Sequence, residues 1–258
     1  MSSVPAGADS SRHSRWFRPL RNGRHGRINL FCFPYAGSGP AVFRQWPEAL
    51  PPSINVIGVC YPGRESRMSE PLYTALRPMV HALSQAIRPW LDQPFAFFGH
   101  SMGAFVAYAL ANRLSQQHAP LPECLFVSGA SAPHLAEAAP LHGLPSREFL
   151  RGIVDLEGIP GEVLDDTEML RYVLRLLRAD LQACETYLLG EVEPVSCPLC
   201  VFGGDRDPRV SVAQLRAWAA YAGLSLDIEV LPGRHFFLHD RRAEVIARVH
   251  DHLRKCCQ

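Results

Sequence analysis

Residues 94–111 read PFAFFGHSMGAFVAYALA, an apolar run, a short turn bounded by glycines and a second apolar run. The first run predicts a buried strand, and the alanine-rich second run predicts a helix. The turn has the pattern G-x-S-x-G, in which the serine stands on a sharp bend from strand to helix. The helix start also directs its amides toward any anion formed beside Ser101. This context favours a nucleophilic serine over one that only caps the helix.

A nucleophilic serine needs a base, and the base needs an acid that orients it. Downstream, residues 198–210 read PLCVFGGDRDPRV, which predicts a strand that ends in a loop with Asp205 and Asp207. The next strand, expected at 226–230, is followed by PGRHFF, which contains His235. The carboxyl ends of strands are where open parallel sheets place their functional groups. Serine, aspartate and histidine follow one another here in the chain order of α/β-hydrolases.

Two aspartates compete for the role of orienting acid. We favour Asp207, because Pro208 restricts it to an extended conformation. Asp205 directly follows two glycines and is suited to a turn in which it bonds its own backbone. The other reading of either residue is a solvated carboxylate paired with Arg206 or Arg209.

The chain contains eleven histidines, and we favour His235 as the base because of its chain order and its place after a strand. His239 is expected to support the site or lie on the surface. His100, inside the turn, is expected to pack in the interior.

Stabilising the oxyanion of an acyl transfer requires two amide N–H groups. One is expected from Met102, which follows the nucleophile. The second is expected from Ala36, in the loop PYAGSGP at 34–40 that follows a predicted strand at 28–33. An ordinary glycine-rich turn is the alternative for this loop.

Strand and helix patterns alternate along most of the chain, which predicts a mostly parallel central sheet flanked by helices. The expected strands are 28–33, 55–60, 94–98, 124–128, 198–202 and 226–230, and the expected helices include 76–90, 215–221 and 241–255. Between about 132 and 196 the alternation stops, and 166–189 predicts a long helix with apolar residues on more than one stripe. We interpret this segment as a helical lid over Ser101; a pair of ordinary core helices is the alternative.

Composition narrows the class of protein. The chain has 258 residues, of which 47% are hydrophobic. Its net charge is only +1, so nothing in its bulk charge favours binding to nucleic acid or to a membrane surface. No apolar run approaches the roughly 18 residues of a transmembrane helix, and no secretory signal is evident. We expect a disordered tail at 1–15, a single α/β domain at 16–258, a monomer and a cytoplasmic location.

The eight cysteines form no regular framework, and several lie in apolar runs, as is typical of reduced core thiols. Cys197 and Cys200 make a C-x-x-C pair without a second pair or histidine at zinc spacing, so we interpret it as coincidence. We expect no metal and no cofactor.

Taken together, these motifs resemble those of type II thioesterases of nonribosomal peptide and polyketide synthesis, relatives of the medium-chain thioesterase of animal fatty acid synthase. The resemblance extends over about 16–253 and is carried by FCFPYAG at 31–37, YPGRESR at 61–67, FGHSMG at 98–103, RAD at 178–180, FGGDRD at 202–207 and GRHFF at 233–237. It implies the α/β-hydrolase fold and a triad of Ser101, Asp207 and His235. It also implies hydrolysis, in trans, of acyl thioesters from the phosphopantetheine arm of acyl or peptidyl carrier proteins.

Two positions depart from the family pattern, which usually has histidine at Tyr35 and glycine at Ser38. Both changes lie in the loop of Ala36 and could alter its conformation or the mouth of the site. Arg64 and Arg67 could dock an acidic carrier protein, or Arg64 could form a structural ion pair with Glu65.

Four rival functions share some of these features. A carboxylesterase or lipase for small esters would use the same triad, and a medium-chain fatty acyl-carrier thioesterase would differ in substrate. An excised terminal thioesterase domain is normally fused to a carrier, and a catalytically dead binding module would not need all three triad residue types.

Overall fold

The computed structural model describes residues 15–21, 26–135, 140–156, 159, 161–187 and 192–256 of the chain. Apart from Arg15, the expected tail at 1–15 lies outside these residues.

A seven-stranded sheet in the order β1-β3-β2-β4-β5-β6-β7 organises the described residues. The strands are β1 (Phe17–Pro19), β2 (Ile28–Phe33), β3 (Ile54–Val59), β4 (Phe95–His100), β5 (Leu125–Ser128), β6 (Leu199–Gly204) and β7 (Leu226–Leu231). All neighbours pair in parallel except β1, which runs antiparallel to β3 at one edge. The expected mostly parallel sheet is therefore confirmed, and β1 is an addition to it.

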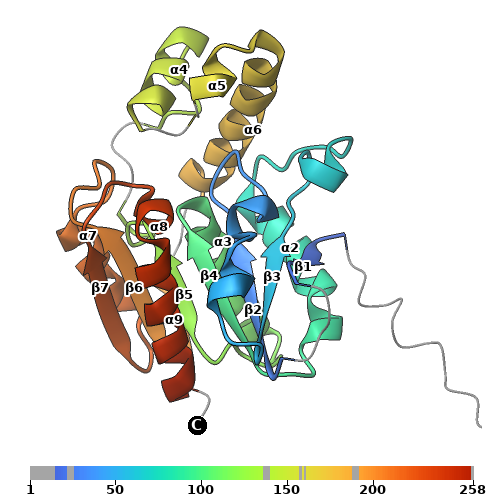
Figure 1. The fold of residues 1–258 in the computed structure, drawn as a ribbon, viewed down its shortest axis with the longest axis vertical. Helices are drawn as coiled ribbons and strands as arrows, with labels where there is room; N and C mark the ends of the chain where they lie inside the picture. Colours follow the sequence, from blue (N-terminus) through green and yellow to red (C-terminus); the bar gives the residue numbers. More distant parts are fainter. Residues whose placement is uncertain are drawn as a thin grey trace, which may run out of the picture.

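Helices cover both faces of the sheet (Figure 1). On one face pack α2 (Leu76–Ala86) and α3 (Met102–Gln116), and on the other pack α1 (Trp46–Ala49) and α9 (Arg242–Cys256). All six residues of β4 are buried: Phe97 belongs to the apolar cluster on the first face and Phe98 to that on the second. Burial on both faces explains why this strand is a continuous apolar run instead of an alternating one.

Two expected helices are divided in the structure. The segment 76–90 forms α2 and then a separate 3-10 turn at Arg88–Trp90, because Pro89 has no amide with which to continue the helix. The segment 215–221 forms the end of α7 (Val212–Arg216) and a 3-10 helix at Ala217–Tyr221. A capping box between Ser211 and Gln214 starts α7 earlier than expected.

Three helices are inserted between β5 and β6: α4 (Ser146–Asp155), α5 (Gly161–Leu164) and α6 (Thr167–Glu185). In Figure 1, α4 and α5 lie beyond the carboxyl ends of the strands, and α6 runs from them toward α3. The three helices, called here the insertion, have an apolar cluster of their own that also packs against Ala36. Residues 136–139, 157–158, 160 and 188–191 of the expected lid lie outside the described residues.

Candidate active site

Ser101 stands on the bend between β4 and α3, in a backbone conformation with φ 51° and ψ −117°. This left-handed region is strained for a residue with a side chain, and such strain is concentrated at functional sites. A Cβ added to Gly99 would lie 2.1 Å from the oxygen of Gly103, and one added to Gly103 would lie 2.0 Å from the oxygen of Phe33. Only glycines therefore allow the bend to pack this closely on the neighbouring strand.

The structure brings His235 and Asp207 together from the loops after β7 and β6. The Nδ1 of His235 lies 2.8 Å from Oδ2 of Asp207, and both side chains are buried. The second oxygen of Asp207 accepts the amides of Arg209 at 2.8 Å and Val210 at 3.3 Å. The carboxylate is thus held in one orientation and presents one oxygen to the imidazole.

Asp205 has different surroundings, with 49% of its side chain exposed. It accepts the amide of Gly233 at 2.8 Å and the guanidinium of Arg206 at 3.3 Å. The Gly233 amide, together with Arg206, lowers the pKa of this carboxyl. Asp205 therefore links the loop of Asp207 to the loop of His235 without contacting the imidazole.

The other two histidines near Ser101 are used structurally. His100 is fully buried, with Nδ1 2.9 Å from the hydroxyl of Ser128, and burial lowers its pKa well below the usual value. His239 shares a 3.0 Å hydrogen bond with the hydroxyl of Tyr35. Burial also lowers the pKa of His239.

Ser101 and His235 line two cavities in common. The larger, of about 270 Å³, extends along α3 and the loop after β5, with Phe105, Leu181 and Tyr187 in its walls. The smaller, of about 30 Å³, lies between the loop after β2 and the insertion. Its walls include Ala36 and the apolar side chains of Ile153, Leu156, Leu177 and Leu181.

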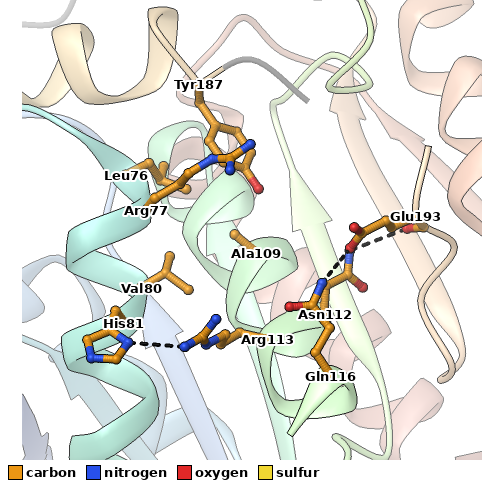
Figure 2. A pocket seen from close by; sticks show the side chains of 10 residues that line it. All are labelled: Leu76, Arg77, Val80, His81, Ala109, Asn112, Arg113, Gln116, Tyr187 and Glu193. Carbon is orange, nitrogen blue, oxygen red and sulfur yellow. Dashed lines mark hydrogen bonds between the residues drawn. The ribbon is translucent and has the colours of Figure 1, made fainter. Parts of the chain in front are cut away.

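A further cavity of about 370 Å³ lies between α2 and α3 and contains neither Ser101 nor His235 (Figure 2). Its polar side chains include Arg113, 3.2 Å from Nδ1 of His81, and Gln116, which donates to Glu193 at 3.0 Å. Tyr187 lines both this cavity and the larger cavity of Ser101.

The two loop arginines are buried, which contradicts the idea that they dock a partner. Arg64 is 4% exposed and Arg67 is 5% exposed. Arg64 also does not pair with Glu65; its partner is Asp180 on α6, 116 residues along the chain. Sequence reasoning assigned no role to Asp180, because charge pairs over such a separation leave no periodic pattern.

No group of three or more histidine, cysteine or acidic side chains in the described parts of the chain is arranged to hold a metal ion. Among the helices described, none is both long and apolar enough to span a bilayer. Cys197 and Cys200 are buried free thiols.

Comparisons with known proteins agree on one family. The family model described as "Thioesterase domain" matches residues 28–253. Linear gramicidin dehydrogenase LgrE of Brevibacillus parabrevis is 40% identical over 244 residues, which cover 93% of this chain and 93% of that relative. Thioesterase PikA5 of Streptomyces venezuelae is 37% identical over 254 residues, or 98% of this chain and 89% of the relative.

Among solved structures, the RedJ thioesterase from the prodiginine pathway of Streptomyces coelicolor superposes with a TM-score of 0.84. It is 36% identical, and the match covers 89% of this chain and 91% of that one. The dehydrogenase name of LgrE refers to that relative, whereas PikA5 and RedJ are both named as thioesterases.

Proposed function

This chain belongs to the thioesterase family, and from that premise we propose how its residues hydrolyse an acyl thioester. It is a type II thioesterase of the kind that acts in trans in nonribosomal peptide and polyketide pathways, on intermediates bound to carrier proteins. We propose that its substrate is the thioester on the phosphopantetheine arm of the carrier. The observation that carries the mechanism is the His235–Asp207 contact of 2.8 Å beside the cavity that holds Ser101.

In the proposed reaction, the hydroxyl of Ser101 attacks the thioester carbonyl while His235 accepts its proton. Asp207 holds the imidazole in the required tautomer and stabilises its charged form. The tetrahedral intermediate then expels the phosphopantetheine sulfur, which takes the proton from His235 and leaves as the thiol. Because the pKa of a thiol is near 8.5, this leaving group needs less help from a general acid than an amine does. Water activated by His235 hydrolyses the resulting ester on Ser101.

The oxyanion would be held by the amides of Met102 and Ala36. Met102 is the first residue of α3, so its N–H is not used within the helix. Ala36 lines the small cavity together with Ser101 and His235, which supports its role as the second donor. Removing one such donor typically costs a factor of about 100 to 1,000 in kcat.

We further propose that the insertion serves as a lid and that the acyl group occupies the larger cavity. Apolar side chains from α4 and α6 wall the small cavity, so the insertion contributes directly to the surroundings of Ser101. Once the acyl chain is bound, these apolar walls would exclude water from the surroundings of Ser101.

The decisive experiment compares wild type with Ser101→Ala on acetyl- and longer acyl-phosphopantetheinyl carrier proteins. Rapid release by wild type and its loss in the variant would support the proposal. Labelling of wild type, but not of the variant, by a fluorophosphonate would identify Ser101 as the nucleophile. If p-nitrophenyl esters were cleaved while carrier-bound acyl groups survived, the esterase function would replace the one proposed.

A further inference from the structure

The loop that carries Ala36 is a tight turn. The amide of Ser38 donates to the oxygen of Tyr35 at 3.2 Å, and Gly37 has φ +76°, as expected for the third residue of a type II turn. The hydroxyl of Ser38 also donates to the oxygen of Tyr35, at 2.7 Å. These bonds close the turn but leave the amide of Gly37 to an acceptor from outside it.

That acceptor is a carboxylate of the insertion. The amide of Gly37 donates to Oδ2 of Asp180, on α6, at 2.8 Å. Asp180 is in turn paired with Arg64 through two hydrogen bonds of 2.7 and 2.8 Å. Arg64 also donates to the oxygen of Ser38 at 3.0 Å, so Arg64 and Asp180 both hydrogen-bond to the same turn. Neither side chain is more than 6% exposed.

A second side chain of α6 holds the turn by packing. Leu177 lies three residues before Asp180 and therefore on the same side of the helix. A Cβ added to Gly37 would lie 2.6 Å from Cδ2 of Leu177, so the two residues are in close contact. Leu177 also lines the small cavity of Ser101. Helix α6 thus contacts the turn through one polar side chain, Asp180, and one apolar side chain, Leu177.

We propose that Asp180, held by Arg64, is a positioning residue for the oxyanion hole. It fixes the turn in the conformation that directs the amide of Ala36 at the reacting carbonyl. This role rests on the proposed function. It adds Asp180 and Arg64, which support the oxyanion hole, to the residues that touch substrate. An oxyanion donor is effective because it is oriented before charge develops. Loss of the support should therefore lower kcat and leave KM nearly unchanged.

Removing one partner alone would leave a buried charge unpaired, which is strongly destabilising, whereas apolar replacement of a whole buried pair is often tolerated. We therefore compare Arg64→Met/Asp180→Leu with Arg64→Met/Asp180→Asn. Both lack the ion pair, but only asparagine keeps an oxygen that can accept the amide of Gly37.

The chain offers a matched control in the same loop. Arg67 pairs with Glu70 at 2.5 Å and contacts the ring of Trp16, away from the turn of Ala36. Arg67→Met/Glu70→Leu removes this neighbouring pair and reports any general effect of disturbing the loop.

For Arg64→Met/Asp180→Leu we expect kcat to fall about tenfold to a hundredfold, which is part of the loss expected for a missing oxyanion donor. We expect KM to change less than about twofold. Affinity for an acyl trifluoromethyl ketone, which forms an oxyanion on Ser101, should fall in parallel. The asparagine variant should recover at least about fivefold of the lost kcat, and the Arg67/Glu70 control should keep wild-type kcat.

Equal kcat in the leucine and asparagine variants, or an equal loss in the control, would overturn the proposal, as would a rise in KM at constant kcat. If the leucine variant does not fold, Asp180→Ala in the Arg64→Met background takes its place. All variants are assayed on an acyl carrier and on a p-nitrophenyl ester. A wild type inactive on the carrier would refute the function, while the ester ratios would still decide the role of Asp180.

Discussion

At the scale of single residues, Asp205 and Asp207 show how two positions in one loop acquire different chemistry. Asp207 is buried against His235, whereas half of the Asp205 side chain is exposed. We expect Asp207→Asn to lower kcat on an acyl carrier by about ten-thousandfold, because the imidazole loses the group that fixes its tautomer. Asp205→Asn should change kcat by less than about fivefold, because asparagine keeps an oxygen for the Gly233 amide and loses only the exposed ion pair with Arg206.

The test is to measure the steady-state kcat of both variants under conditions in which both are equally folded. Equal losses of kcat would mean that Asp205 also acts on His235, and a negligible loss for Asp207→Asn would remove it from the triad.

We expect His100 to make the stability of the fold depend on pH. Its pKa is lowered in the folded state, first by burial and then by the nearby His235 and His239. Protonation would also place charge on a ring whose Nε2 has no hydrogen-bond partner among the described residues. As pH falls below the unfolded value of about 6.5, the unfolded state therefore binds the proton first. The stabilisation present above that pH is lost at about 1.4 kcal/mol per pH unit.

Urea unfolding at pH 7, 6 and 5 tests this expectation with wild type and His100→Gln. The variant should lose less stability between pH 7 and pH 5 than wild type does. His239, whose pKa is shifted in the same direction, should leave part of the dependence in place. Identical slopes for both proteins would show that His100 does not contribute.

At the scale of elements, the junction of β4 and α3 allows almost no added volume. A Cβ at position 103 would meet backbone, the oxygen of Phe33 on β2, and not a flexible side chain. We expect Gly103→Ala to destabilise the fold by about 1–3 kcal/mol or more and to abolish measurable hydrolysis, because α3 must shift away from β2.

The test is to compare the thermal unfolding and the hydrolytic activity of Gly103→Ala with those of wild type. Ala104→Gly serves as a control on the same turn of the helix. Full activity in Gly103→Ala would show that the bend can relax without moving Ser101.

The elements that sequence patterns could predict are those specified by nearby residues. The strand patterns of β4, β6 and β7 and the loops after them placed Ser101, Asp207 and His235 at one edge of the sheet. β1 was not expected, because three residues are too few for a periodic pattern and its pairing with β3 is decided in space. The division of the expected helix 76–90 into α2 and a 3-10 turn follows from Pro89, a signal that was available in the sequence.

At the scale of the whole molecule, two cavities follow one another along α3, and Tyr187 lines both. If the acyl group occupies the cavity of Ser101, this side chain limits its length. We expect Tyr187→Ala to raise kcat/KM for long acyl chains relative to acetyl by about tenfold, within the range that a few methylenes provide in an apolar pocket.

Competition between acetyl- and dodecanoyl-carrier substrates measures this ratio directly. Tyr221→Phe, which keeps the ring and lies deeper in the core, serves as the control. An unchanged ratio in Tyr187→Ala would place the acyl chain elsewhere.

Long-range relations between charges were beyond sequence reasoning. Arg64 was considered as a surface residue because arginines usually are, and a local partner, Glu65, was available. In the structure Glu65 pairs with Arg18, and Arg64 is buried against α6. Only the folded chain shows that the insertion and the turn of Ala36 share one ion pair.

The separation of 116 residues between Arg64 and Asp180 has a consequence for the order of folding. Closing so long a loop costs more entropy than bringing together the strands that pair in the sheet, which lie closer to one another in sequence. We therefore expect the insertion to dock onto a core that is already assembled. During refolding, fluorescence from buried core tryptophans such as Trp46 and Trp218 should recover first. Hydrolytic activity should return later, with the kinetics of docking.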